Sequence, residues 1–131
     1  MATAYRQITA ANAAKLDALA GGAIVRGQPI QATNAPIQPT DVFTVKLCAD
    51  GLRPDGTAID AIDLGGTGRF APRSSAALPA LLGGAVAAGD LLKVSGGKWI
   101  KCSPGDQAWM RALQSGSSGD LVNAEPCDRT A

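Results

Sequence analysis

The sequence predicts a mostly β protein, a small sandwich or barrel of short antiparallel strands with an N-terminal arm or short helix. Among its 131 residues are 16 glycines and 8 prolines, and turn residues of this kind separate short apolar runs. Glutamate occurs once, whereas helical proteins place glutamate and lysine freely on exposed helix faces. A chain of this length fits a single domain with a real hydrophobic core.

The N-terminal segment, residues 1–21, is expected to form the arm or short helix. Residues 9–20 are rich in alanine and place Ile8, Leu16 and Leu19 on roughly one side before a Gly-Gly pair that favours a helix end. A helix this short is marginal alone, so it must dock on the domain or stay an arm that a partner orders. The candidate interface residues of this arm are Tyr5, Arg6, Ile8, Leu16 and Leu19.

Residues 22–127 are expected to form one β domain, followed by a C-terminal tail at residues 128–131. The apolar runs with strand character are residues 23–27, 28–33, 41–48, 57–64, 68–72, 90–95, 98–102, 107–113 and 120–127. Residues 65–83 are largely Gly-, Ser- and Pro-rich and predict a long irregular middle segment, with room for one helical turn broken at Pro79. Such a loop in a compact domain is usually functional or ordered by a partner.

Glycine-containing pairs mark the turns between these strands, because glycine takes positive φ without a steric penalty. The predicted turn residues are Gly89, Asp90, Gly96, Gly97, Gly105, Asp106, Gly119 and Asp120. Residues 22–33 and 84–95 also align without gaps, with a shared Gly-Ala start and a shared central glycine. This similarity leaves open whether the chain contains a duplicated unit or a chance match between Gly- and Ala-rich segments.

Charge and composition exclude several classes of function. Twelve basic and 11 acidic residues leave a net charge of +1, and the cations are scattered singly, so we expect neither a nucleic acid nor a membrane partner. The sequence has no histidine and three cysteines without C-x-x-C spacing. We expect three buried, reduced thiols, although one pair remains possible. With no signal peptide pattern at the N-terminus, the chain is expected to be made soluble inside a cell.

No residue pattern predicts catalysis, a cofactor or a metal ion. Ser95 and Lys98 have the spacing of the nucleophile and lysine of penicillin-binding proteins, but a Gly-Gly pair between two strand-like runs predicts a hairpin, and the companion motifs are absent. The acidic cluster consists of Asp50, Asp55, Asp60 and Asp63. Its spacing fits no calcium loop, and the first two residues precede glycines and so favour turns. We therefore expect a protein that is not an enzyme.

Trp99 is a candidate interface residue whose face depends on the register of the predicted hairpin. A two-residue loop pairs Val94 with Trp99 and turns the indole inward. A three-residue loop pairs Lys93 with Trp99 and places it on the outer face. The second register keeps Lys93 and Lys101 in water and the aliphatic residues together, so we prefer it. Trp99 then either lies under its own loops or anchors a protein interface.

The order of these parts resembles the small capsid cement, or head decoration, proteins of tailed bacteriophages. The resemblance covers residues 22–33 and 84–127, whereas the arm and the middle segment fit it poorly. The matching parts are the Gly-Asp pairs at 89–90 and 119–120, the hairpin at 96–97, the turn at 104–106, the strand at 108–113 and the earlier segment at 24–31. These are turn features rather than a signature motif.

The resemblance implies a β domain that assembles, commonly as a homotrimer, on the outer face of the virion capsid. There it would stabilise contacts between major capsid protein subunits, after synthesis in the host cytoplasm and without any catalytic residue. Two alternatives are a tail or baseplate component of similar build and a small ligand- or carbohydrate-binding β domain that uses Trp99. Tryptophan fluorescence and solution mass would distinguish the last of these.

Overall fold

The structure is a computed structural model that describes residues 13–16, 23–33, 43–63 and 66–131. All the regular elements in these ranges are strands and none is a helix, which confirms the mostly β fold class. The strands are β1 (Ala13–Leu16), β2 (Pro29–Ala32), β3 (Phe43–Leu47), β4 (Gly56–Ala58), β5 (Thr67–Pro72), β6 (Leu78–Leu81), β7 (Leu91–Ser95), β8 (Lys98–Lys101), β9 (Gln107–Ala112) and β10 (Leu121–Thr130).

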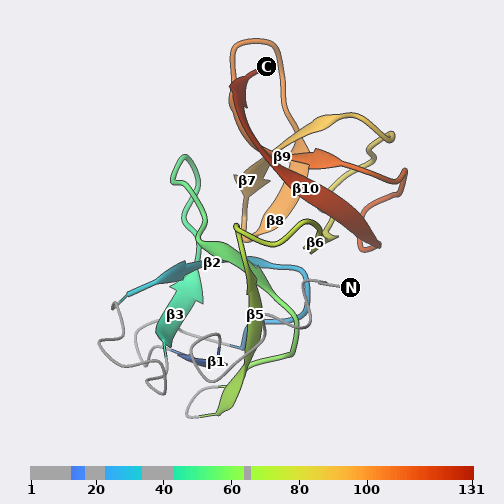
Figure 1. Ribbon diagram of the computed structural model, residues 1–131. Helices are drawn as coiled ribbons and strands as arrows, with labels where there is room; N and C mark the ends of the chain where they lie inside the picture. The colour runs from blue at the N-terminus through green and yellow to red at the C-terminus, as the bar shows by residue number, and fades with distance from the viewer. Residues whose placement is uncertain (1–12, 17–22, 34–42, 64–65) are drawn as a thin grey trace.

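The N-terminal half forms a closed barrel with the strand order β1-β3-β2-β4-β5, at the bottom of Figure 1. β1 closes it by pairing in parallel with β3 and antiparallel with β5. The barrel has its own core of buried side chains, which are Ile24, Ile30, Val45, Ala58, Ile62 and Phe70. Closure leaves β1 with a partner on each side, so the barrel has no open sheet edge.

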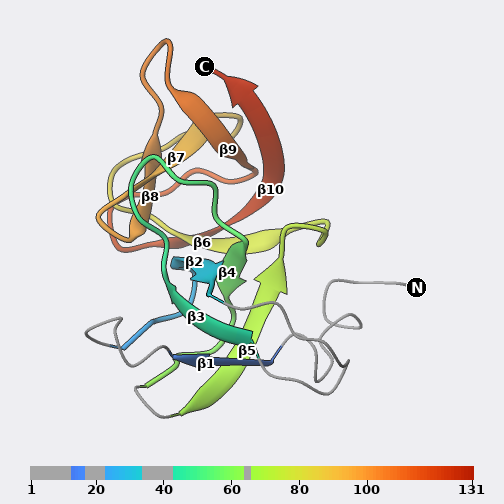
Figure 2. The same cartoon turned by 90° about the vertical axis from the view of Figure 1, so that its left-hand side faces the viewer.

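The C-terminal half forms a second five-stranded sheet with the order β6-β10-β9-β7-β8. Alternate residues face inward, as a strand requires: Leu92 and Val94 of β7 are buried, and so are Met110 and Ala112 of β9. The long strand β10 pairs with β6 and with β9 and curves along the sheet (Figure 2). Further members of its core are Leu78, Leu82, Trp99, Val122 and Ala124.

One turn recurs four times, at residues 25–28, 87–90, 103–106 and 117–120. In each copy the third residue is a glycine, with φ of +88°, +92°, +91° and +88° in chain order, as a type II turn requires. In each copy the fourth side chain accepts a hydrogen bond from the first backbone N–H, over 2.8, 2.8, 2.8 and 2.9 Å. The accepting side chains are Gln28, Asp90, Asp106 and Asp120.

Each of these turns is also fixed to one residue of a neighbouring segment. The glycine N–H donates to the carbonyl of that neighbouring residue. The N–H of the neighbouring residue donates back to the carbonyl of the fourth turn residue. The four neighbouring residues are Ala58, Ala112, Ala131 and Leu82, in the order of the turns. The similar segments 22–33 and 84–95 contain the first two copies, so their sequence similarity corresponds to the same local structure.

The two halves meet at the first of these turns. The Gly27 carbonyl accepts hydrogen bonds from the Leu81 N–H (3.0 Å) and from the indole N–H of Trp99 (3.2 Å). The Gln28 side chain donates to the Gly97 carbonyl over 3.1 Å. A Cβ on Gly27 would lie 2.7 Å from the Leu81 nitrogen, so only glycine permits this approach of the two backbones.

The N-terminal helix prediction is wrong at residues 13–16, which form β1. An isolated alanine-rich segment gains little from helix formation, whereas the barrel offers it backbone partners on both β3 and β5. Leu16 therefore belongs to a barrel strand instead of a separate arm. The other candidate residues of the arm, Tyr5, Arg6, Ile8 and Leu19, lie outside the described residues.

The expectations for the middle segment and the tail are also wrong. Residues 68–72 lie in β5, as their strand character predicted, but β6 forms where an irregular loop or helical turn was expected. Pro79 is tolerated because β6 lies at the end of its sheet's strand order, where a missing N–H costs least. The tail expected at 128–131 continues β10, and Ala131 donates to the Asp106 carbonyl over 2.7 Å. Long-range pairing orders both segments.

The preferred hairpin register is wrong as well. β7 and β8 pair Val94 with Trp99 and Ser95 with Lys98, which leaves the two-residue loop Gly96–Gly97. Both glycines have positive φ, +61° and +74°, as a type I′ turn requires. Trp99 is fully buried, because the first half of the chain supplies the carbonyl that accepts its indole N–H.

Candidate protein interface

Of the predicted interface residues, the structure describes only Leu16 and Trp99. Trp99 is buried in the core of the second sheet, and Leu16 lies in β1 of the barrel. The remaining arm residues fall outside the described part of the chain. The predicted turn residues lie at turns, where their side chains and backbone groups hold the fold together. Candidate contact residues must therefore be sought elsewhere on the surface.

The loop between β3 and β4, residues 48–55, is the most distinctive surface feature. It leaves the barrel and reaches along the second sheet beside β7 and β8 (Figure 2). Cys48 at its start is buried in the core of the second sheet. The Asp50 carboxylate accepts a hydrogen bond from the Gly96 N–H over 2.9 Å. With these two attachments fixed, Leu52 remains 48% exposed.

A polar hollow lies between this loop and the diverging strands β7 and β9. These strands pair only at Leu91–Arg111 and Leu92–Met110. Beyond that point they border a hollow of about 260 Å³ whose lining includes Asp50, Lys93, Asp106, Gln107 and Trp109. Lys93 donates to the Asp106 carboxylate over 2.7 Å. This hydrogen bond is the main cause of a lowered pKa for Asp106 and a raised pKa for Lys93.

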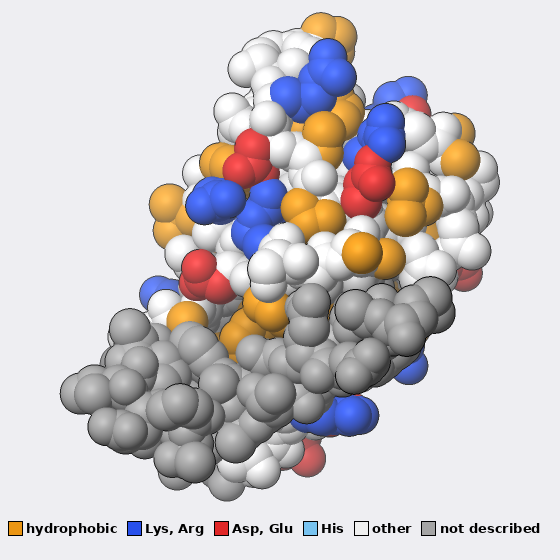
Figure 3. All heavy atoms as spheres, in the orientation of Figure 1, with side chains coloured by type: hydrophobic (Ala, Val, Ile, Leu, Met, Phe, Trp, Pro, Cys, Tyr) orange, Lys and Arg blue, Asp and Glu red, His pale blue; other side chains and the backbone are white. Residues whose placement is uncertain are grey.

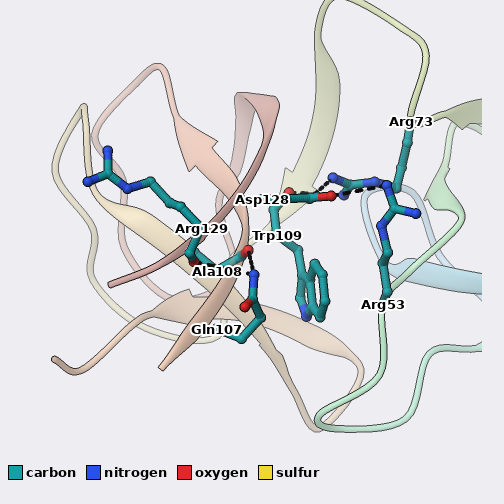
Figure 4. A network of polar contacts seen from close by, with 7 residues as sticks. All are labelled: Arg53, Arg73, Gln107, Ala108, Trp109, Asp128 and Arg129. Carbon is teal, nitrogen blue, oxygen red and sulfur yellow. Dashed lines mark hydrogen bonds and ion pairs between the residues drawn. The ribbon is translucent and has the colours of Figure 1, made fainter. Parts of the chain in front are cut away.

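Two arginines and one aspartate form a cluster on the other side of Trp109 (Figure 4). Arg73 follows β5, Arg53 lies in the β3–β4 loop and Asp128 lies in β10. Arg73 donates to the Trp109 carbonyl over 2.9 Å and to one Asp128 oxygen. Arg53 pairs with the other Asp128 oxygen over 3.0 Å. The side chain of Arg73 is only 12% exposed, against 60% for Arg53.

The burial of Arg73 carries an energetic cost. Its Nε atom is buried and has no hydrogen-bond partner within the described ranges, and burial is the main cause of a lowered pKa for the guanidinium, which Asp128 opposes. An unmet buried donor on a charged group destabilises a fold. Charged groups in such settings concentrate at functional sites. An open hollow of about 420 Å³ lies here, lined by Arg53, Arg73, Ser74, Pro126 and Asp128.

The described surface carries both signs of charge. On the face in Figure 3, basic and acidic side chains lie side by side over the second sheet, with apolar side chains between them. Arg111 and Glu125, for example, pair across β9 and β10. This mixed pattern lacks the single-sign field that attracts nucleic acid. No helix among the described residues is long and apolar enough to span a membrane.

Asp50, Asp55 and Asp60 of the acidic cluster have local structural roles. Asp55 accepts a hydrogen bond from the Ala32 N–H, and Asp60 pairs with Arg69. Within the described ranges, no group of three or more His, Cys, Asp or Glu side chains could hold a metal ion. Burial, followed by the charge of Asp55, raises the pKa of the Cys48 thiol to about 12.

All three cysteines are free, but only Cys48 is fully buried. Cys102 and Cys127 are half-buried, so the expectation of three buried thiols is wrong for these two.

Sequence reasoning missed the arginine cluster because no local sequence pattern predicts it. Arg53 is 20 residues from Arg73, which is 55 residues from Asp128, and only the packing of the loop against β10 brings them together. Trp109 is partly buried and packs against the core of the second sheet. The spacing of residues in the sequence does not predict that a half-buried tryptophan lies beside this basic cluster.

The fold and this surface define an all-β protein with two sheets and a candidate protein interface. No protein-family model and no curated protein match the sequence. Among solved structures, the chain is similar to the N base of the head fiber protein gp8.5 of bacteriophage phi29, with a TM-score of 0.71 and 16% sequence identity. The match covers 91% of this chain and 94% of the other. This chain and the N base therefore share a fold over most of the two chains compared.

Proposed function

We propose that this chain is a structural protein of a bacteriophage head. The observation that carries the proposal is the shared fold with the base of a phage head fiber protein over 91% of this chain. A second line of support is the resemblance of residues 22–33 and 84–127 to head decoration proteins. The two lines are separate, since one rests on backbone arrangement and the other on the order of turns and strands in the sequence.

The specific role that we propose is attachment to the outer face of the head, where the protein stabilises contacts between major capsid protein subunits. The β3–β4 loop and the arginine cluster provide a surface for this contact, because they combine an exposed leucine, a half-buried tryptophan and charged groups. Tryptophan and arginine are enriched at protein interfaces. Repeated weak contacts on a shell retain a protein through multivalency when its copies are linked.

We further propose that the protein acts as a homotrimer, which would link three such surfaces. Sedimentation analysis should then give a mass three times the 13.2 kDa of one chain. A monomer at all concentrations would contradict the trimer and leave head attachment to be tested by itself.

Binding to phage heads tests the main proposal. Purified protein should bind heads that lack it and should raise their melting temperature, because a ligand that binds only the assembled shell stabilises it. Heads that already carry the protein are the matched control and should show no further rise. Absence of both binding and stabilisation would contradict the proposal, and a gold label found on tails or baseplates would favour the alternative tail component.

The carbohydrate-binding alternative loses its basis in this structure. It relied on an accessible Trp99, whereas that side chain is fully buried and donates its indole N–H to the Gly27 carbonyl. An indole in this position cannot stack on a sugar ring.

A further inference from the structure

We propose that Arg53 and Arg73 bind an acidic peptide segment of the protein's partner, with one carboxylate of that segment seated beside Asp128 in the hollow that the two arginines line. The identity of the partner as a head protein rests on the proposed function. The chemistry of the site rests only on the structure of this chain.

Arg73 is fixed in place before any partner arrives. Its two terminal nitrogens donate to the Trp109 carbonyl and to Asp128, so β9 and β10 both hold it. With only 12% of the side chain exposed, little conformational freedom is left to lose on binding. Its buried Nε has no hydrogen-bond partner among the described residues, so this placement costs some stability.

Arg53 supplies the accessible half of the site. Its side chain is 60% exposed, and its ion pair with Asp128 is made through a single terminal nitrogen. A guanidinium carries five N–H donors in a planar fork, so this contact leaves donors on the exposed edge of Arg53. Such a fork matches the two oxygens of a carboxylate and binds them in parallel.

The charge within the hollow favours an added anion. Two guanidinium groups line it and share the single carboxylate of Asp128. Asp55 also lies close enough to influence Arg73, but its carboxylate accepts from the Ala32 N–H and does not line the hollow. One further carboxylate would balance the two cations of the lining.

The surroundings favour a peptide over nucleic acid as the source of this carboxylate. Leu52, next to Arg53, is 48% exposed and offers a contact for an apolar side chain beside the acid. Ser74 and Pro126 complete the lining with one hydroxyl and one apolar ring. A nucleic acid strand carries a negative charge on every phosphate, whereas the lining offers only two guanidinium groups beside the carboxylate of Asp128.

The first test titrates the ¹⁵N-labelled full chain with the peptide acetyl-Gly-Leu-Glu-Asp-Leu-Gly-amide while the arginine side-chain N–H signals are followed by NMR. We expect saturable shifts of the Arg53 and Arg73 signals in the millimolar range. The same peptide with Gln and Asn in place of its acids should give none. Inorganic phosphate and a thymidine octanucleotide are titrated in parallel, and shifts with these but not with the acidic peptide would overturn the inference.

The second test compares variants on phage heads. Arg53→Glu should weaken head binding at least tenfold, whereas the matched control Arg129→Glu, a charge reversal outside the hollow, should bind as the unchanged chain does. Because the Arg53 side chain is 60% exposed, we expect the variant to fold, and thermal melting checks this. If Arg53→Glu binds heads fully, the site is refuted while head attachment stands. If the unchanged chain does not bind heads, head attachment fails, and the peptide titration alone decides for or against the site.

Discussion

Replacing Trp99 with alanine should lower the free energy of unfolding by about 3–5 kcal/mol. The side chain is fully buried and packs in the core of the second sheet. A buried tryptophan removes about 150–250 Å² from water, which at about 25 cal/mol per Å² gives an upper bound of roughly 4–6 kcal/mol. The lost indole hydrogen bond adds little, since the Gly27 carbonyl keeps the Leu81 N–H as a donor.

Urea unfolding followed by far-ultraviolet circular dichroism measures this effect without relying on the fluorescence of the mutated residue. Trp99→Phe keeps most of the apolar volume and should cost about 1–2 kcal/mol, mainly because it loses part of the ring. Leu52→Ala is the matched control at a site that is 48% exposed, and it should stay within about 0.5 kcal/mol of the unchanged chain. If Trp99→Ala also stays within that margin, the indole lies on the outer face, as the three-residue register requires, and the reasoning is refuted.

Three further predictions concern single residues. Gly89→Ala should cost about 1–2 kcal/mol in urea unfolding from backbone strain alone, because φ is +92° and no atom lies within 4 Å of the new Cβ; unchanged stability would contradict the turn. The Lys93 hydrogen bond lowers the pKa of Asp106, so its stabilising effect should be present above about pH 4 and lost as the pH falls through the lowered pKa. Asp106→Asn should reduce that acid-side loss in unfolding curves recorded across pH, and an unchanged slope would count against the ion pair. At pH 8 iodoacetamide should label the half-buried Cys127 before Cys48, whose buried thiol has a pKa of about 12; mass spectrometry showing equal rates would refute this order.

Local chemistry was sufficient to predict the strand-rich fold class and several of its turns. Gly89, Gly105 and Gly119 each precede an aspartate, and the pair encodes both positive φ and a side-chain acceptor for the turn. These interactions join residues only three positions apart, so the sequence pattern encodes them directly. The first turn uses Gln28 in the place of aspartate, and its similarity to the others is visible only through the alignment of two segments.

Features that depend on distant partners could not be predicted in the same way. β1 is a strand because β3 and β5 pair with it, although its alanine-rich composition favours a helix. The hairpin register follows from the burial of Trp99 against a segment 72 residues away, which outweighs the simpler separation of lysines from aliphatic residues. The arginine cluster joins three segments of the chain, and neither composition nor spacing relates them.

Electron microscopy of phage heads that lack this protein, incubated with the purified chain, tests the central claim most directly. We predict added density at regularly repeated positions on the outer surface of the head shell. Heads that remain bare under these conditions, or density confined to tails, would contradict the account.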